Sequence, residues 1–344
     1  MALFDSADIL QMADIIIALV VSGIATSIIL PPLMRRMKER GITGPDWNKK
    51  DRTEIPELGG IALLFGFSIG ISIAVGILKE FGSFNATPIL AAIGVLFIAG
   101  MIGLIDDVSD ISQRWKALLV AFAALPLVIA GSADQIIGLP FGFQIVLSAN
   151  ETLKLVYWLV IVPLAVTGAS NALNMSAGYN GLETGQVAII SLALLFTTVL
   201  VKGPMESILI FASLMGAAMG LNYFNGHPAR VFVGDVGTLS MGAVVAAGAI
   251  IGGIELAGVV AIAPAFYELG ATMYYSIKNI DRKVLCQRPI IDDKERLHTP
   301  KGAERYTLAY WILSKRPMTE RNLVRVILGI YAFSGILAII VAIL

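Results

Sequence analysis

The chain has 344 residues, of which 57% are hydrophobic and 15% are charged. A soluble domain carries roughly 25% charged residues, so this composition excludes an ordinary soluble protein and indicates an integral membrane protein. The formal net charge is zero, which indicates no nucleic-acid partner. The single cysteine, Cys286, excludes an internal disulfide.

The apolar residues occur in long blocks. The first block follows an acidic start (Asp5, Asp8, Asp14) and has no small-residue cleavage site, so we expect a retained span and not a signal peptide. A transmembrane helix needs about 20 mostly apolar residues. Ten blocks approach this length, near residues 10–34, 58–78, 89–105, 115–131, 152–170, 186–201, 206–224, 237–253, 257–277 and 323–343. The sequence therefore predicts an all-α integral membrane protein, a bundle of about ten transmembrane helices forming one polytopic domain over residues 1–344.

Lysine and arginine set the expected orientation of this bundle. They concentrate in alternate loops, whereas the intervening loops hold Lys79, Lys154 and Lys202 only at their edges. Because basic loops stay on the cytoplasmic side, we expect both termini outside and an active site on the cytoplasmic face. These alternate loops, predicted to be cytoplasmic, cover residues 35–57, 106–114, 171–185, 225–236 and 278–322, and the third of them holds no Lys or Arg. The last of them is long enough to form a lid that contributes to the active site.

The second basic loop begins with two adjacent carboxylates, Asp106 and Asp107, followed by Asp110. Adjacent carboxylates repel each other unless a cation lies nearby. If the segment is helical, Asp107 and Asp110 share a face, and oxygen ligands at this density favour Mg²⁺ or Mn²⁺. The alternative for this motif is a solvated acidic loop between two spans.

The third of these loops is rich in asparagine and glycine. Gly178 and Gly181 permit tight turns and close approach of the backbone to a ligand. Asn174 offers a neutral oxygen ligand, and Asn180 can donate and accept hydrogen bonds at a nucleobase edge. An ordinary Asn–Gly turn is the alternative for this loop.

The later loops hold further polar candidates. Asp235, between Gly234 and Gly237, is expected to be a metal ligand in a tight turn or the N-cap of the next span, and the two roles are compatible. Glu268 lies inside the ninth predicted span near Pro264. An ionisable residue there is a functional candidate by default, but we favour a carboxyl that pairs with another helix or a polar break at the proline.

The two histidines, His227 and His298, lie in different loops and do not predict a zinc site. His298 lies among basic residues of the last loop, which also holds Arg288. Such a loop has enough cations to hold a diphosphate. Contact with anionic lipid headgroups is the alternative.

Taken together, these motifs resemble the polyprenyl-phosphate N-acetylhexosamine-1-phosphate transferase family, and look most similar to its UDP-GlcNAc:dolichyl-phosphate GlcNAc-1-phosphate transferase branch. The matching strings are GPDWNKKDRTEIPELGG (44–60), GLIDDVSDISQRWK (103–116), NALNMSAGYNGLETGQ (171–186), RVFVGDVGT (230–238) and TERNL (319–323). They follow in order, all on the same predicted side of the membrane. The family likewise has ten spans.

The chain departs from the family pattern at two places. The peptidoglycan branch carries Asp where this chain has Ala177, which argues against a muramoyl-pentapeptide substrate. The dolichol branch has an Arg-His-Arg-like string after a cysteine, where this chain reads Cys286-Gln287-Arg288-Pro289. This second departure leaves the residues that hold the N-acetyl group unassigned. The last loop is also shorter than in the eukaryotic branch, which points to an archaeal source.

The resemblance implies that the chain transfers GlcNAc-1-phosphate from UDP-GlcNAc to a membrane polyisoprenoid (dolichyl) phosphate, with Mg²⁺ or Mn²⁺, and releases UMP. This is the first step of lipid-linked oligosaccharide synthesis for N-glycosylation, in the cell membrane, or in the endoplasmic reticulum of a eukaryote. The family also suggests a homodimer. The alternatives are another UDP-N-acetylhexosamine or undecaprenyl phosphate, for cell-surface polysaccharide. A lipid or solute transporter is remote, because it would place ionisable residues near the bilayer midplane, often in two inverted halves.

The resemblance also implies roles for individual residues. Catalysis is assigned to Asp106, Asp107 and Lys116, and metal binding to Asn174 and Asp235. Asn180 matches a residue that meets uracil, and Glu57 matches the acidic residue of the first-loop motif. The convergence of the loops adds further candidates for substrate binding: Asp46, Asn48, Glu183, Arg230, Arg288 and His298.

The chemistry of the acceptor limits what the acidic pair has to do. A phosphate monoester has a second pKa of about 6 and is largely dianionic at neutral pH. A general base is therefore not required, and we expect Asp106 and Asp107 to orient the metal and Lys116.

Overall fold

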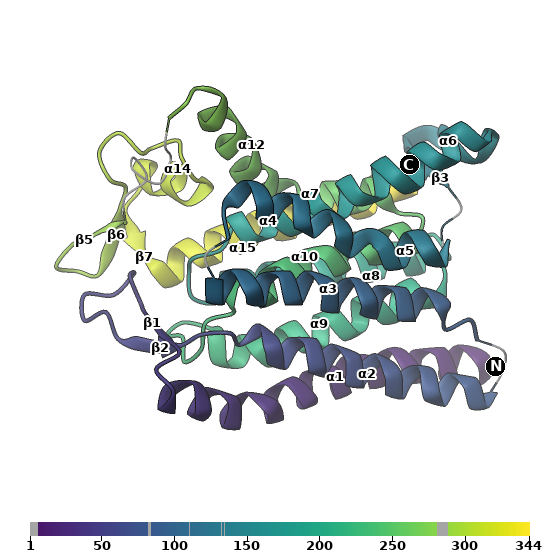
Figure 1. Ribbon diagram of the computed structural model, residues 1–344, viewed down its shortest axis with the longest axis horizontal. Helices are drawn as coiled ribbons and strands as arrows, with labels where there is room; N and C mark the ends of the chain where they lie inside the picture. Colours follow the sequence, from purple (N-terminus) through teal and green to yellow (C-terminus); the bar gives the residue numbers. More distant parts are fainter. Residues whose placement is uncertain (1–5, 82–83, 110, 132, 134, 281–287) are drawn as a thin grey trace, which may run out of the picture.

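The computed structural model describes residues 6–81, 84–109, 111–131, 133, 135–280 and 288–344, which form a bundle of helices with three small sheets (Figure 1). Asp110 and Cys286, singled out above, lie outside the described residues. The long helices are α1 (Ser6–Glu39), α2 (Gly60–Phe81), α3 (Thr87–Ser109), α8 (Leu182–Leu200), α9 (Met205–Asn225), α10 (Gly234–Ile251) and α15 (Glu320–Ile343).

A further long span, Glu151–Met175, joins α6 (Glu151–Val156), η4 (Tyr157–Ile161) and α7 (Val162–Met175). Within the described residues, eight helices are therefore long and apolar enough to cross a membrane. The pair α11 (Glu255–Ala261) and α12 (Ala263–Ile277) forms a ninth candidate span that bends by 74° at its break.

The fourth predicted span, near 115–131, is built differently from the others. It consists of α4 (Gln113–Val120), η1 (Ala121–Ala124) and α5 (Leu125–Ala130), and its apolar run has fewer than 18 residues. Such a run is shorter than the roughly 20 residues that cross the hydrocarbon core. The all-α membrane fold is thus confirmed, and the protein is a multi-pass membrane protein. The number and orientation of its spans stay predictions.

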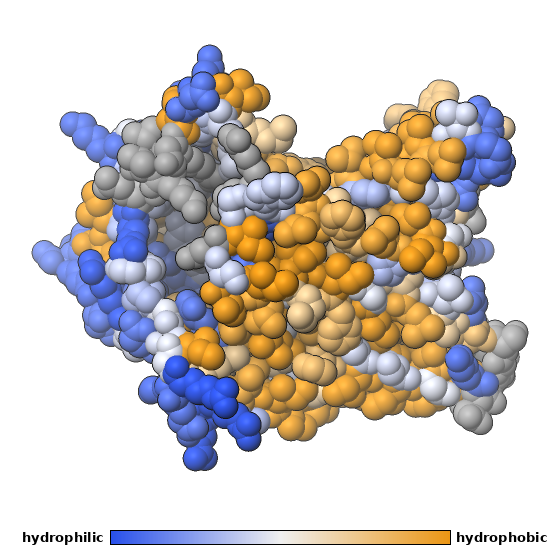
Figure 2. Space-filling model, in the orientation of Figure 1, coloured by the Kyte–Doolittle hydropathy of each residue, from blue (hydrophilic) through white to orange (hydrophobic). Residues whose placement is uncertain are grey.

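The bundle has two polar ends and an apolar belt between them. Figure 2 shows hydrophobic residues over the sides of the helices and hydrophilic residues gathered mainly at one end. Large apolar side chains face outward along the belt, such as Ile28 on α1 (68% exposed) and Phe333 on α15 (61% exposed). In water such a surface would drive aggregation, so it indicates contact with lipid. The carboxyl end of α15 and the described start of α1 lie at the same end of the bundle (Figure 1).

The opposite end, which we call the loop end, carries most of the short elements. The hairpin β1 (Thr43–Pro45) and β2 (Glu54–Pro56) lies there, next to the sheet β5–β6–β7 (Figure 1). That sheet comprises β5 (Ile290–Ile291), β6 (Arg296–His298) and β7 (Met318–Thr319), with α14 (Leu308–Lys315) beside it. The hairpin β3 (Ile136–Gly138) and β4 (Gln144–Val146), with η2 (Pro140–Gly142) and η3 (Leu147–Ala149), lies at the other end.

Helix α10 is the centre of the bundle. It packs against α2, α3, α7, α8 and α9, and 89% of its span is buried. Small residues along α10 allow this close packing, as in other membrane helices. The first turn of α10 lies at the loop end and holds Asp235 in place on a rigid, buried element.

Candidate functional site

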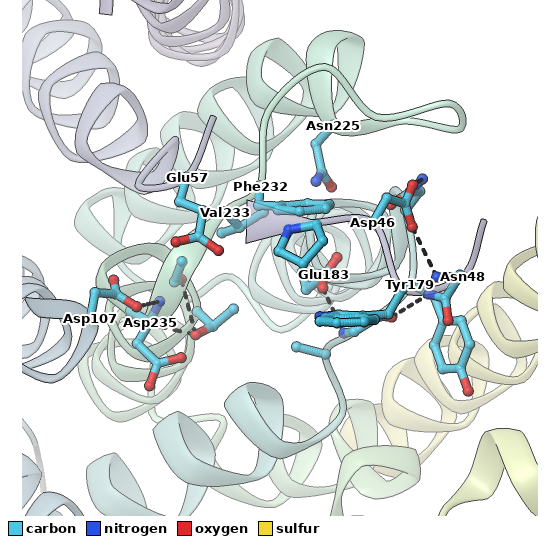
Figure 3. A pocket seen from close by; sticks show the side chains of 17 residues that line it. Asp46, Asn48, Glu57, Asp107, Tyr179, Glu183, Asn225, Phe232, Val233 and Asp235 are labelled. Carbon is cyan, nitrogen blue, oxygen red and sulfur yellow. Dashed lines mark hydrogen bonds between the residues drawn. The ribbon is translucent and has the colours of Figure 1, made fainter. Parts of the chain in front are cut away.

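A pocket of about 360 Å³ opens at the loop end, and segments far apart in sequence contribute to it. Figure 3 shows Glu57, Asp107 and Asp235 at one end of this pocket and Asp46, Asn48 and Tyr179 at the other. We call these the acidic end and the amide end. The residues that line the pocket are Pro45, Asp46, Trp47, Asn48, Glu57, Asp107, Ala177, Gly178, Tyr179, Asn180, Glu183, Asn225, Phe232, Val233, Gly234, Asp235 and Thr238.

Backbone pairing joins the first loop to the segment before α10. The N–H of Phe232 donates to the carbonyl of Pro56, and the N–H groups of Gly59 and Gly60 donate to the carbonyls of Phe232 and Val233, all at 2.8 Å. These bonds satisfy main-chain groups that would otherwise be buried without partners. They also place Glu57 opposite the start of α10.

Asp107 caps α10 from a different helix. Its two carboxylate oxygens accept the N–H of Asp235 at 2.9 Å and the N–H of Val236 at 3.0 Å. The first N–H groups of a helix have no partner within the helix, and a carboxylate there also complements the helix dipole. The chain enters α10 through Gly234 with φ of +71°, where a Cβ would lie 2.9 Å from Asp107 Oδ2. Asp107 and not Asp235 thus caps this helix, so the N-cap interpretation of Asp235 is wrong.

Lys116 connects the acidic pair to Asp235. Its ammonium lies 2.8 Å from Asp106 Oδ2 and also contacts Asp235 Oδ2. The Lys116 residue is 5% exposed. Two carboxylates around one buried ammonium hold that cation in a fixed position at the start of α4.

Asn174 completes this group from the last turn of α7. Its amide nitrogen donates to Asp235 Oδ1 and to Thr238 Oγ1, both at 2.8 Å. The amide oxygen of Asn174 accepts no hydrogen bond from the described residues. The structure therefore brings together all five residues that the sequence predicted for catalysis and metal binding.

The acidic end has the donor set that a divalent cation needs. No Lys or Arg is among the described residues that line the pocket, whereas three of its carboxylates, those of Glu57, Asp107 and Asp235, lie at this end. Burial raises the pKa of the Glu57 carboxyl, and the negative charge of Glu54 raises it further. Lys116 offsets only part of this negative charge, so a diphosphate would be repelled from this end without a further cation. No cluster of three His, Cys, Asp or Glu side chains close enough to hold a metal occurs in the described part of the chain. The set fits Mg²⁺, which is commonly held by one or two protein oxygens, water and substrate phosphate.

The amide end is built from the first loop and the turn between α7 and α8. Asn180 Nδ2 donates to Asp46 Oδ2 at 2.9 Å, and Asn48 Nδ2 donates to the carbonyl of Gly178 at 2.8 Å. Glu183, in the first turn of α8, accepts the N–H of Gly178 at 2.7 Å. Its Oε2 is buried and has no partner among the described residues. The third loop is thus a fixed turn, and Asp46, Asn48, Asn180 and Glu183 all line the pocket as the sequence predicted for a shared site.

Three predicted binding residues lie away from the pocket. Arg230 stacks on Phe224 and Tyr223 at the end of α9. Arg288 stacks on Trp47 in a neighbouring basic pocket of about 270 Å³, which Lys49, Lys50 and Arg52 also line. A substrate role for these two arginines stays a prediction.

The third of these residues, His298, lies on β6, where its Nε2 is 3.0 Å from Asp292 Oδ2. It does not line the pocket, and its predicted substrate contact stays a prediction. Glu268 accepts the N–H of Leu308 at 2.7 Å and so pairs with the start of α14. This bond confirms the structural interpretation of that buried carboxyl.

Sequence reasoning missed several residues of the site. The Phe232 ring lines the pocket and lies between its two ends (Figure 3). A single aromatic residue in an apolar strip gives no signal that distinguishes it from a core residue. Glu320, in the string TERNL, is 3% exposed and contacts the third loop. An acidic residue at the first turn of an apolar helix was the available signal for it.

Comparisons with known proteins agree with this geometry. The chain is 28% identical to a protein of Sulfolobus acidocaldarius provisionally named UDP-N-acetylglucosamine–dolichyl-phosphate N-acetylglucosaminephosphotransferase, over 96% of this chain and 97% of that protein. It is 30% identical to a glycosyltransferase, also provisionally named, of Methanocaldococcus jannaschii, over 94% of this chain and 96% of that protein. It is 26% identical to a Bacillus subtilis protein provisionally named undecaprenyl-phosphate N-acetylglucosaminyl 1-phosphate transferase, over 84% of this chain and 77% of that protein.

The family comparison covers the middle of the chain. A sequence profile of glycosyl transferase family 4 matches residues 89–253, which include Asp106, Asp107, Lys116, Asn174 and Asp235. Because the similarity to the Methanocaldococcus jannaschii protein extends over nearly the whole of both chains, this chain belongs to glycosyl transferase family 4.

Proposed function

We propose that the chain transfers N-acetylglucosamine-1-phosphate from UDP-GlcNAc to a membrane polyisoprenoid phosphate of the dolichyl type and releases UMP. The observation that carries this proposal is Asp235, which lines one end of a 360 Å³ pocket whose other end is lined by amides. Lys116 and Asn174 do not line the pocket and contact Asp235 from behind its wall. A nucleoside diphosphate sugar needs charge neutralisation at its phosphates and hydrogen bonds at its base. The two ends of the pocket provide these separately.

The reaction is a phosphoryl transfer. An oxygen of the acceptor phosphate attacks the β-phosphorus of UDP-GlcNAc and forms a new P–O–P bond. The bond from the β-phosphorus to the bridging oxygen breaks, and its electron pair leaves with UMP. Because the acceptor is already dianionic, the protein has to position the reactants and stabilise charge, and no residue has to abstract a proton.

The residues at the acidic end divide this work. Lys116 is held by Asp106 and Asp235 where a cation can stabilise negative charge on the transferred phosphate. Asp107 fixes the first turn of α10 and thereby the position of Asp235. We propose that Asn174 and Asp235 hold Mg²⁺, with Mn²⁺ as a substitute. When bound, the metal supplies positive charge that neutralises the diphosphate and the leaving UMP.

The amide end is proposed to take the nucleoside. The amide of Asn180 donates to Asp46, and this pair presents polar groups to the pocket. The ring of Phe232 offers a surface for a base to stack on. The Glu183 oxygen without a partner is buried behind this wall of the pocket.

The membrane fold supports a proposal for the lipid and the cellular setting. We propose that the acceptor lipid reaches the pocket from the bilayer, that the loop end faces the cytoplasm, and that the protein works in the cell membrane as the first enzyme of lipid-linked oligosaccharide synthesis for N-glycosylation. A homodimer is proposed from family resemblance alone. The same reaction on undecaprenyl phosphate is the second candidate, because the Bacillus subtilis relative is named for that acceptor.

The test is UMP release by the purified full chain with Mg²⁺. We expect release with UDP-GlcNAc and a short dolichyl phosphate, and slower release with the matching undecaprenyl phosphate or with UDP-GalNAc. Faster turnover of undecaprenyl phosphate would favour the second candidate. Absence of UMP release with every UDP-N-acetylhexosamine and both lipids would overturn the enzyme assignment.

A further inference from the structure

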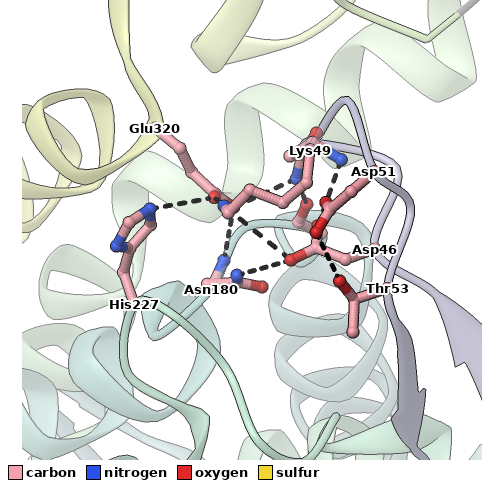
Figure 4. Close-up of polar contacts among 9 residues, drawn as sticks. Asp46, Lys49, Asp51, Thr53, Asn180, His227 and Glu320 are labelled. Atoms are coloured by element: carbon pink, nitrogen blue, oxygen red, sulfur yellow. Dashed lines mark hydrogen bonds and ion pairs between the residues drawn. The ribbon is translucent and has the colours of Figure 1, made fainter. Parts of the chain in front are cut away.

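A buried carboxylate, Glu320, lies directly behind the amide end of the pocket. It is the first residue of α15 and is 3% exposed. Its Oε1 accepts the N–H of Asn180 at 2.9 Å and the amide of Asn48 at 3.1 Å, and its Oε2 contacts the ammonium of Lys49. Figure 4 shows Lys49 and Asn180 turned toward this carboxylate, with His227 on its other side. The His227 Nε2 lies 3.7 Å from Oε2, beyond hydrogen-bond reach.

The contact with the Lys49 ammonium calls for a negatively charged side chain at this position. A buried charge is costly unless it is paired and hydrogen-bonded, and Glu320 has one cation and two neutral donors. Its place in the first turn of α15 is favourable because the helix dipole stabilises negative charge there. A carboxylate that served only to stabilise α15 would need only groups of its own helix. The described groups that donate hydrogen bonds to Glu320 come from the first and third loops instead.

The partners of Glu320 are the residues that shape the amide end. Asn48 and Asn180 line the pocket, and Glu320 itself does not. Asn180 also donates to Asp46 Oδ2, and Lys49 lies 3.7 Å from the same oxygen. Glu320 therefore links both loops at one point, and its own side chain stays outside the volume that a substrate can occupy.

The two ends of the pocket are fixed by different parts of the chain. The acidic end is held by α3, α4, α7 and α10 through Asp107 and Lys116. The amide end depends on Glu320, which comes from the C-terminal helix. A change at Glu320 should thus alter the amide end without moving the groups at the phosphates.

We propose that Glu320 is a positioning residue for the nucleoside: it fixes the Asp46–Asn180 pair and so sets affinity for the nucleotide part of the donor, without contacting the substrate. The proposal rests on the proposed function, because it takes the amide end to be the nucleoside end.

The direct test is Glu320→Gln in the purified full chain. Glutamine has the same shape and keeps an oxygen for Asn180 and Asn48, but it loses the charge that pairs with Lys49. Without that charge the Asp46–Asn180 pair should be held less firmly, so we expect the KM for UDP-GlcNAc to rise roughly tenfold or more. The kcat and the KM for the lipid phosphate should each change by less than about threefold, since the acidic end is untouched. The inhibition constant of UMP should rise by the same factor as the KM for the donor.

Two further variants make the test decisive. Asp293→Asn is the matched control, because Asp293 also pairs with a lysine of the first loop, Lys50, at 3.0 Å, but on the surface. It should leave all four constants unchanged. Lys49→Gln breaks the same ion pair from its more exposed side. It should raise the KM for the donor and the inhibition constant of UMP. This variant replaces Glu320→Gln in the test if Glu320→Gln does not fold.

The outcomes separate this inference from the proposed function. A fall in kcat at unchanged donor KM, or unchanged UMP inhibition, would overturn the positioning role while leaving the enzyme assignment intact. If the wild-type chain releases no UMP, the proposed function fails. Calorimetric binding of UMP to wild type and to Glu320→Gln still tests the positioning role of Glu320. Equal UMP affinity of the two proteins, or no UMP binding to either, would then overturn it.

Discussion

The Asp107 carboxylate accepts the backbone N–H of Asp235 at 2.9 Å, so one acidic residue of the site holds another through the main chain. Its second oxygen accepts the N–H of Val236 at 3.0 Å. Both oxygens are therefore engaged in capping α10. A carboxylate engaged in this way can support the proposed phosphate site without taking a proton.

Asp107→Asn should test this capping role. The amide keeps only one acceptor, so one of the two N–H groups at the start of α10 loses its partner. Loss of a helix cap costs about 1 kcal/mol, and we expect a lower thermal unfolding midpoint together with reduced UMP release. A variant that kept its unfolding midpoint but lost the acid limb of the pH–rate profile would instead identify Asp107 as a general base.

Lys116→Met should impair turnover much more than donor binding. The ammonium is fixed between Asp106 and Asp235, and loss of one preorganised donor to a developing charge costs about 10²-fold or more in kcat. The measurement is steady-state UMP release. Lys154→Met is the control, since Lys154 forms an exposed pair with Glu151 at 2.7 Å. A kcat for Lys116→Met within about threefold of wild type would contradict the role of Lys116 at the phosphates.

Asn174→Ala and Asp235→Asn should each raise the Mg²⁺ concentration that gives half-maximal activity, by about tenfold or more if each removes one ligand. Chelation of divalent cations should abolish activity of the wild type. Asn171→Ala is the matched control on the same helix, because the Asn171 amide donates to the carbonyl of Thr167, within α7. Full activity in the presence of a chelator would refute the metal proposal.

Much of the site could be predicted from the sequence because its residues occur in compact strings on predicted loops. The positive-inside pattern grouped these loops on one side, and the structure brings Asp106, Lys116, Asn174 and Asp235 into contact. Hydropathy also predicted the helices, since each spanning segment is a long apolar block. Near 115–131 the apolar helical run, Trp115–Ala130, continues through η1 but is shorter than the other spans, and its crossing of the membrane stays a prediction.

The residues that could not be predicted act through tertiary contacts. Nothing in the pair Asp106–Asp107 indicates that one member holds a lysine and the other caps a helix whose first residue is more than a hundred positions away. The sequence marks Glu320 only as an acidic residue at the start of an apolar helix. It does not show that the partners of Glu320 are in the first and third loops. In the last loop His298 is engaged with Asp292, a partner that the sequence did not indicate, and the substrate role of that loop stays a prediction.

Gly103→Ala should disturb the site from inside the bundle. A Cβ at Gly103 would lie 2.3 Å from the carbonyl oxygen of Asp235 and 2.5 Å from the nitrogen of Val236. Overpacking of this kind costs about 1–3 kcal/mol, so we expect a lower unfolding midpoint and weaker activity. Gly76→Ala on α2 is the control, since no atom lies within 4 Å of its Cβ position. Equal unfolding midpoints for the two variants would show that α3 and α10 can separate without cost.

The hairpin that carries His298 should lose order in acid. The ring of His298, together with hydrogen bonds from Arg296 and Lys294, holds the pKa of the Asp292 carboxyl well below its ordinary value. The folded state then binds fewer protons than the unfolded state between the two pKa values. Asp292 therefore stabilises the hairpin fully above its unfolded pKa of about 3.9, and this contribution is lost as the pH falls through the folded-state pKa.

Hydrogen exchange over residues 290–298 measures this effect. Wild-type protection, corrected for intrinsic exchange rates, should fall as the pH is lowered below about 4. Asp292→Asn should be less protected at neutral pH and show no further acid-dependent loss, because an amide cannot titrate. Asp293→Asn, at the fully exposed neighbouring position, should behave as wild type. If the wild type and Asp292→Asn lost protection in parallel, some other group would have to control the acid response of the hairpin.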